Sequence, residues 1–123
     1  MKKVLIVEDE QAYLQLLHDQ LVKRGHEVFD AHDGEEGLKL AQEKRPDLIL
    51  LDLLMPKVGG LDMLIALRKS AWGEKIPVIV LTNVSGSYEI TNAMYSNVSE
   101  YLIKSDVKLE DLIDDVQRFL EKG

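Results

Sequence analysis

Acidic side chains lie at the ends of two strongly apolar segments of this sequence. Glu8 and Asp9 come directly after the apolar residues 3–7, and Asp52 lies within the apolar residues 48–55. An ionised carboxylate among apolar neighbours is costly unless a cation or a hydrogen-bond donor compensates it. Clustered carboxylates offer the all-oxygen ligands that suit Mg²⁺, whereas zinc usually takes His or Cys. These three acids therefore predict a magnesium site.

A hydroxyl group and an ammonium group follow two further apolar segments. Thr82 ends residues 77–82, and Lys104 follows residues 101–103. Both groups can donate hydrogen bonds to phosphoryl or carboxylate oxygens. Taken singly, each has a simpler interpretation, as a β-branched strand residue or a surface lysine. Asp52 is also open to a structural role, and Glu8 and Asp9 suit the first turn of a helix.

The elements that position these side chains alternate between short apolar strands and amphipathic helices. Predicted strands cover residues 3–7, 26–31, 47–53, 77–82 and 100–103. Helical stripes cover residues 14–22, 38–41, 61–67 and 109–120, with a weaker one over 87–95. Such alternation predicts a parallel sheet with helices on both faces. The carboxyl ends of parallel strands share one edge, so the acids, Thr82 and Lys104 should meet there.

The composition limits the class of protein. The chain has 123 residues, 46% of them hydrophobic, which is enough for one domain with its own core. A formal charge of −7 argues against direct nucleic-acid binding, and the lack of cysteine excludes disulfides and thiolate metal sites. We find no signal peptide and no apolar segment long enough to span a bilayer, and expect a soluble, cytoplasmic protein. His18, His26 and His32 are interpreted as structural or exposed.

The whole pattern resembles the receiver domains of two-component response regulators. The resemblance implies an α/β, flavodoxin-like (βα)5 three-layer sandwich with five parallel strands in the order 2-1-3-4-5, formed by one domain over residues 1–123. Five fragments in the right order and spacing support it. They are Val7-Glu8-Asp9-Glu10, Asp33-Gly34, Asp52-Leu53-Leu54-Met55-Pro56 with Gly60, Leu81-Thr82, and Tyr101-Leu102-Ile103-Lys104.

The resemblance also implies a phosphorylation switch. Asp52 would accept a phosphoryl group from a histidine kinase or a phosphotransfer protein and form an aspartyl phosphate. Asp9, Asp52 and the backbone carbonyl of Leu54 would hold Mg²⁺ directly, with Glu8 acting through water. The chain would catalyse only its own phosphotransfer and dephosphorylation, and would not be an enzyme toward an external substrate.

Three further residues receive roles from the same resemblance. Lys104 would pair with a phosphoryl oxygen, and Thr82 would hydrogen-bond the phosphoryl group once it has formed. Tyr101 would then move inward and change the surface of the fourth helix, fifth strand and fifth helix. That surface would control a downstream protein partner or an output domain.

The sequence departs from the family pattern near the predicted site. Ser105 follows Lys104 where the family usually has a cis-proline; a cis peptide before a residue other than proline is costly, so the sequence leaves the isomer of this peptide open. Asn83 replaces a small residue after Thr82 and would narrow access to Asp52. Apolar Leu54 and Val84 suggest slow loss of phosphate. Gly37, within a predicted helix, should cost about 1 kcal/mol relative to alanine.

Alternative functions were weighed against this one. A flavin carrier lacks support, because acids occupy the position of its phosphate loop. A Mg²⁺-dependent phosphohydrolase would need an insertion that grips the substrate. The serious alternative is a receiver-like interaction module that acts without phosphorylation. The chain would work alone or as part of a longer regulator, as a monomer or a weak homodimer.

Overall fold

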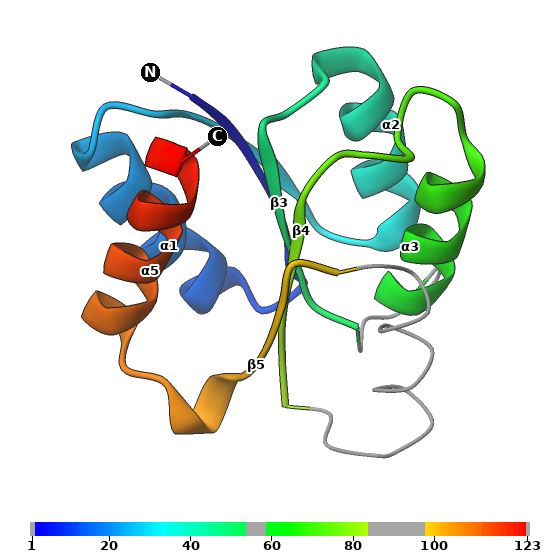
Figure 1. The fold of residues 1–123 in the computed structure, drawn as a ribbon. Helices are drawn as coiled ribbons and strands as arrows, with labels where there is room; N and C mark the ends of the chain where they lie inside the picture. The colour runs from blue at the N-terminus through cyan, green and yellow to red at the C-terminus, as the bar shows by residue number, and fades with distance from the viewer. Residues whose placement is uncertain (1, 54–58, 84–97, 123) are drawn as a thin grey trace.

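The protein forms five strands and, in its described part, four α-helices (Figure 1). The computed structural model describes residues 2–53, 59–83 and 98–122. The strands are β1 (Lys3–Val7), β2 (Glu27–Ala31), β3 (Leu48–Leu51), β4 (Val78–Thr82) and β5 (Glu100–Ile103). The helices are α1 (Gln11–Lys23), α2 (Gly34–Lys44), α3 (Gly60–Lys69) and α5 (Leu109–Lys122), with a short 3₁₀-helix, η1 (Lys104–Asp106).

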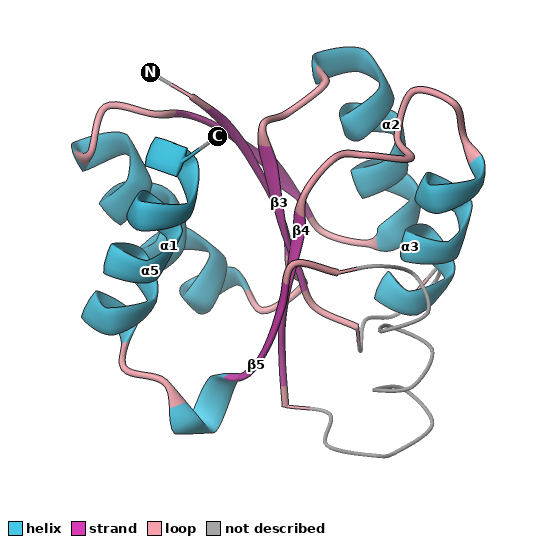
Figure 2. Ribbon diagram, in the orientation of Figure 1, coloured by secondary structure: helices cyan, strands magenta, loops and turns pink. Residues whose placement is uncertain are grey.

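All five strands run parallel in one sheet in the order β2-β1-β3-β4-β5 (Figure 2). Val7 is in register with Leu51 on the neighbouring strand, and Thr82 is in register with Ile103. The predicted fold class and strand order are therefore confirmed. Because the strands are parallel and in register, the residues that follow them meet at one edge.

Helices cover both faces of the sheet, with α1 and α5 on one side and α2 and α3 on the other (Figure 1). The alternation of side chains along each strand divides the core accordingly. Ile6 and Leu50 pack toward α1 and α5, while Val7 and Leu51 pack toward α2 and α3. This double burial explains why β1, β3 and β4 are almost continuously apolar.

The predicted strand boundaries were wrong by one or two residues at several ends. β3 ends at Leu51 rather than at residue 53, so Asp52 follows the strand. The register pairs with β1 and β4 end at Leu51, and Leu53, although apolar, lies outside the strand. The helix expected over residues 87–95 lies outside the described residues.

Gly37 has a packing role that the sequence prediction missed. A Cβ atom built on it would lie 2.9 Å from Cγ2 of Val7 and 2.8 Å from Sδ of Met63. Val7 belongs to the central strand β1 and has no flexible end that could move aside. Packing therefore opposes the helix-propensity cost expected for this glycine, because a side chain at position 37 would meet the sheet that α2 approaches.

We expect Gly37→Ala to destabilise the protein by about 1–2 kcal/mol, since overpacking outweighs the gain in helix propensity. Urea unfolding measures this difference. Lys39→Ala is the control, because Lys39 is exposed on the same helix and its replacement should change stability by less than about 0.5 kcal/mol. Equal or greater stability of Gly37→Ala would contradict the packing argument.

Candidate functional site

A crevice of about 390 Å³ opens at the carboxyl edge of the sheet. It brings together five of the residues predicted from the sequence, contributed by the ends of β1, β3, β4 and β5. Its lining consists of Glu8, Asp9, Glu10, Asp52, Thr82, Asn83 and Lys104. Of the other predicted positions, Tyr101 does not line the crevice, and Leu54 and Val84 lie outside the described residues.

The backbone fixes two of the acids by continuing the strand pairing. The N–H of Glu8 donates to the carbonyl of Ala31 at 2.9 Å, and the N–H of Asp52 donates to the carbonyl of Val7 at 3.0 Å. On the other side, the first residue of α3 closes against Asp52. A Cβ atom on Gly60 would lie 1.9 Å from the Asp52 carbonyl oxygen, so glycine is required there. Asp52 is thus held between the sheet and α3.

Lys104 supplies the positive charge of the crevice. Its Nζ contacts Oε1 of Glu8 and lies 3.2 Å from Oδ2 of Asp52 and 3.9 Å from Oε1 of Glu10. The side chain of Lys104 is 10% exposed, that of Glu8 3% and that of Asp52 7%. These charges therefore interact in a crevice with little water, where an unpaired charge is costly.

The pKa values of Glu8 and Lys104 are both raised, but for different physical reasons. Burial raises the pKa of Glu8 to about 7, although Lys104 and the N–H of Glu10 oppose the shift; the charge of Asp52 adds to it. Burial by itself lowers the pKa of Lys104, but Glu8 and Asp52 outweigh burial and leave that pKa raised. A single ammonium thus leaves the acidic cluster short of positive charge.

Three carboxylates in this crevice are arranged to hold a cation. One carboxylate oxygen from each of Glu8, Asp9 and Asp52 lies within 4.8 Å of the others. Glu8 and Asp52 are buried and Asp9 is exposed, so the cluster opens to solvent on one side. Because the donors are all oxygens, the set suits a hard divalent cation.

Thr82 and Tyr101 occupy different environments on neighbouring strands. Thr82 ends β4, is fully buried and lines the crevice. Tyr101 lies on β5, is half-buried and packs against the core on the side of α2 and α3. The Lys104–Ser105 peptide, whose isomer the sequence left open, is trans.

Tyr13 is a site residue that the sequence prediction missed. It lies in the first turns of α1, and the Nζ of Lys104 is 4.8 Å from the centre of its ring. A cation over an aromatic face is attracted by the electron density of the ring. The only sequence signal was the spacing of Tyr13 from Asp9, about one helical turn, which an apolar core residue would share.

The histidines lie away from the crevice, as predicted. Each histidine ring contacts one polar side chain on a helix or strand elsewhere, and the Nδ1 atom of His26 also accepts from the backbone N–H of Lys2 at 3.3 Å. The pairs are His18 with Asp30 at 2.9 Å, His26 with Gln117 at 2.8 Å and His32 with Glu36 at 3.0 Å.

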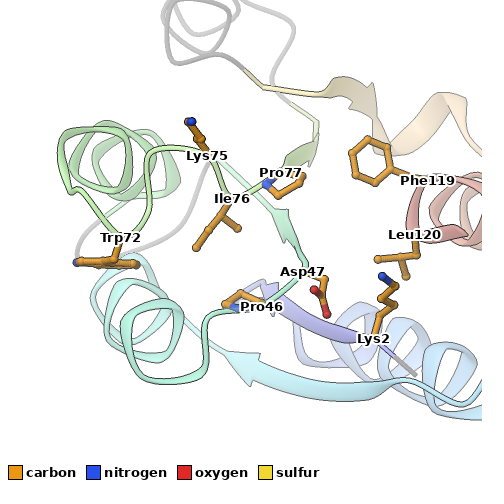
Figure 3. Close-up of a pocket in the computed structure, with 9 residues that line it drawn as sticks. All are labelled: Lys2, Pro46, Asp47, Trp72, Lys75, Ile76, Pro77, Phe119 and Leu120. Atoms are coloured by element: carbon orange, nitrogen blue, oxygen red, sulfur yellow. The ribbon is translucent and has the colours of Figure 1, made fainter. Parts of the chain in front are cut away.

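A second hollow, of about 380 Å³, lies at the opposite edge of the sheet (Figure 3). Its lining is mostly apolar and includes Trp72, Ile76, Pro77 and Phe119. The guanidinium group of Arg45 lies 5.3 Å from the Trp72 ring centre. Since Asp47 is the one acid among its lining residues, this hollow offers no cluster of carboxylates.

Comparison with known proteins agrees with this geometry. Residues 4–117 match the family model of the response regulator receiver domain. The chain belongs to this family. The receiver domain is 34% identical over 104 residues to the transcriptional regulatory protein AfsQ1 of Streptomyces coelicolor, an alignment that covers 85% of this chain and 45% of AfsQ1. The chain therefore spans less than half the length of that relative.

Solved receiver structures share the fold over nearly the whole domain. The chemotaxis protein CheY4 of Vibrio cholerae superposes with a TM-score of 0.85 at 30% identity, covering 96% of this chain and 98% of CheY4. The Mn²⁺-bound form of the response regulator Rcp1 gives a TM-score of 0.82 at 32% identity, covering 96% and 91%. Receiver domains are signalling proteins and not enzymes in the usual sense.

A double-mutant cycle tests the contact between Tyr13 and Lys104 in this receiver domain. We expect Tyr13→Leu and Lys104→Met to show a coupling free energy of about 0.5–2 kcal/mol in urea unfolding. The matched cycle with Tyr13→Phe should give a coupling near zero, because phenylalanine keeps the ring. Equal coupling in the two cycles would contradict a ring–cation interaction.

Proposed function

We propose that residues 1–123 form a phosphorylation-dependent receiver switch whose phosphoacceptor is Asp52. The observation that supports this most directly is the Lys104 ammonium, 3.2 Å from a buried Asp52 carboxylate in the crevice of a receiver domain. An ammonium in this place can pair with an oxygen of a phosphoryl group attached to Asp52. Thr82, buried at the end of β4, lines the same crevice and offers a hydroxyl donor.

The transfer itself is a displacement at phosphorus. A carboxylate oxygen of Asp52 forms a bond to phosphorus as the bond from phosphorus to an imidazole nitrogen of the donor breaks. That nitrogen keeps the electron pair and takes a proton from solvent. Lys104 stabilises the negative charge on the phosphoryl oxygens during the transfer, and the Thr82 hydroxyl donates to one of them afterwards.

The carboxylates of Glu8, Asp9 and Asp52 fit a divalent cation, and we assign this ion as Mg²⁺. Asp9 and Asp52 would bind it directly, together with the carbonyl of Leu54, and Glu8 would act through water. The Mn²⁺-bound form of Rcp1 supports a divalent cation in a related receiver. When bound, the ion offsets the charge of the acids and of the incoming phosphoryl group.

The physiological partners follow from the family. The phosphodonor is a histidine kinase or a phosphotransfer protein, and the target is a downstream protein or an output domain that senses β5 and α5. Tyr101, half-buried on β5, is the side chain that would move inward. Direct binding to nucleic acid is not part of the proposal, because the net charge is −7.

Location and assembly complete the proposal. We expect a cytoplasmic protein that is a monomer or a weak homodimer. In the part of the chain that the structure describes, no helix has the length and apolar character needed to cross a membrane.

Intact mass tests the acceptor. After incubation with Mg²⁺ and acetyl phosphate and an acid quench, the wild type should gain one phosphoryl group, and Asp52→Asn should gain none. Some receivers respond only to their kinase, so a null result is followed by beryllofluoride binding. Failure of both would favour the alternative, an interaction module that acts without phosphorylation.

Thermal unfolding tests the metal site. Mg²⁺ should raise the Tm of the wild type, by roughly 3–6 °C for each ~1 kcal/mol of binding. Asp9→Asn should lose most of this increase, because it removes one of the charged ligands. Glu43→Gln, an exposed acid on α2, is the control and should keep it. An unchanged increase in Asp9→Asn would contradict the assignment of Asp9.

A further inference from the structure

Two residues that depart from the family pattern are bonded to each other. The N–H of Ser105 donates to the Oδ1 atom of Asn83 at 3.2 Å. Asn83 follows β4 and Ser105 lies in η1, 22 positions further along the chain. The hydrogen bond uses a backbone N–H, which proline in place of Ser105 could not supply.

This hydrogen bond lies just beyond the last register pair of two strands. Thr82 of β4 is in register with Ile103 of β5. The hydrogen bond joins Asn83, directly after Thr82, to Ser105, two residues after Ile103. Lys104 lies between Ile103 and Ser105. Its backbone is therefore fixed on one side by the sheet and on the other by Asn83.

The conformation of this backbone sets the direction in which the Lys104 side chain points. It reaches from the start of η1 to Glu8 and to Asp52 in the crevice. The N–H of Val107 donates to the carbonyl of Lys104 at a long 3.4 Å, so η1 by itself holds the residue weakly. The Asn83 side chain joins this turn to the end of β4 by accepting the hydrogen bond from Ser105.

We propose that Asn83 is a positioning residue for Lys104. Its carboxamide oxygen ties the turn after β5 to the end of β4 and so directs the ammonium at the phosphoryl group on Asp52. This inference rests on the proposed function and adds a determinant of its rate. Asn83 and Ser105 are both exposed, so breaking the link should leave the fold intact and slow only the transfer.

The test compares three variants by their rate of phosphorylation with acetyl phosphate and Mg²⁺. Asn83→Ala removes the acceptor, and Ser105→Pro removes the donor N–H. Each should slow phosphorylation by roughly three- to tenfold, the rate factor that corresponds to the net free energy of one hydrogen bond. Ser105→Ala keeps the N–H and should match the wild type.

Two readouts separate positioning from a general loss of structure. The double variant Asn83→Ala/Ser105→Pro should be no slower than the slower single variant, because both remove one interaction. The dissociation constant for Mg²⁺ should not rise in any of them, since the acids Glu8, Asp9 and Asp52 lie on other segments. Additive rate losses, or weaker Mg²⁺ binding, would overturn the proposal.

Amide exchange of Ser105 tests the link without phosphorylation. Exchange should be faster in Asn83→Ala than in the wild type, whereas Asn83→Asp keeps an acceptor oxygen and should restore the slow exchange. Unchanged exchange in Asn83→Ala would show that the hydrogen bond does not hold the turn, and the proposal would fail.

If the wild type takes no phosphoryl group, the proposed function fails and the positioning role is judged separately. The ¹³Cε resonance of Lys104 should then shift in Asn83→Ala and in Ser105→Pro, but not in Ser105→Ala. An unmoved resonance in the first two variants would show that Asn83 does not position Lys104.

Discussion

The buried ion cluster of Lys104 with Glu8 and Asp52 is the interaction on which the rest of the site depends. Two carboxylates that are almost fully buried need positive charge close by, and one ammonium satisfies them only in part. Burial raises the pKa of Glu8 to about 7 even with Lys104 beside it, and the charge of Asp52 adds to that shift. Because two buried carboxylates share one ammonium, binding of a cation or attachment of a phosphoryl group would change the electrostatic interactions in the crevice.

The parallel sheet makes this cluster by bringing separate strand ends to one edge. Glu8, Asp52 and Lys104 are far apart in sequence and come together because β1, β3, β4 and β5 are in register. Rigid packing beneath the edge keeps them there. The absence of a side chain at Gly60 lets α3 close against the backbone of Asp52, so Asp52 has little room to shift.

Much of the fold was predictable because apolar runs and helix-ending residues are local features of the sequence. The apolar runs of β1, β3 and β4 marked strands buried on both faces, and Gly25, with a φ of +89°, follows the end of α1, where glycine commonly stands. Strand ends were less predictable: the apolar run around Asp52 continues beyond the point where β3 loses its neighbours. The hydropathy of a segment does not show where its β-pairing ends, because pairing depends on the neighbouring strands.

The sequence by itself determined the chemistry of this protein: which side chains follow the strands, the acidic charge, and the match to a receiver domain. Tertiary structure alone decided which of those side chains touch. The ring of Tyr13 over Lys104, the close packing of Gly37 on Val7, and the bond from Ser105 to Asn83 all join segments distant in the chain. Such contacts depend on how helices and loops pack on the sheet. Residue types and their spacing along one segment do not predict that packing.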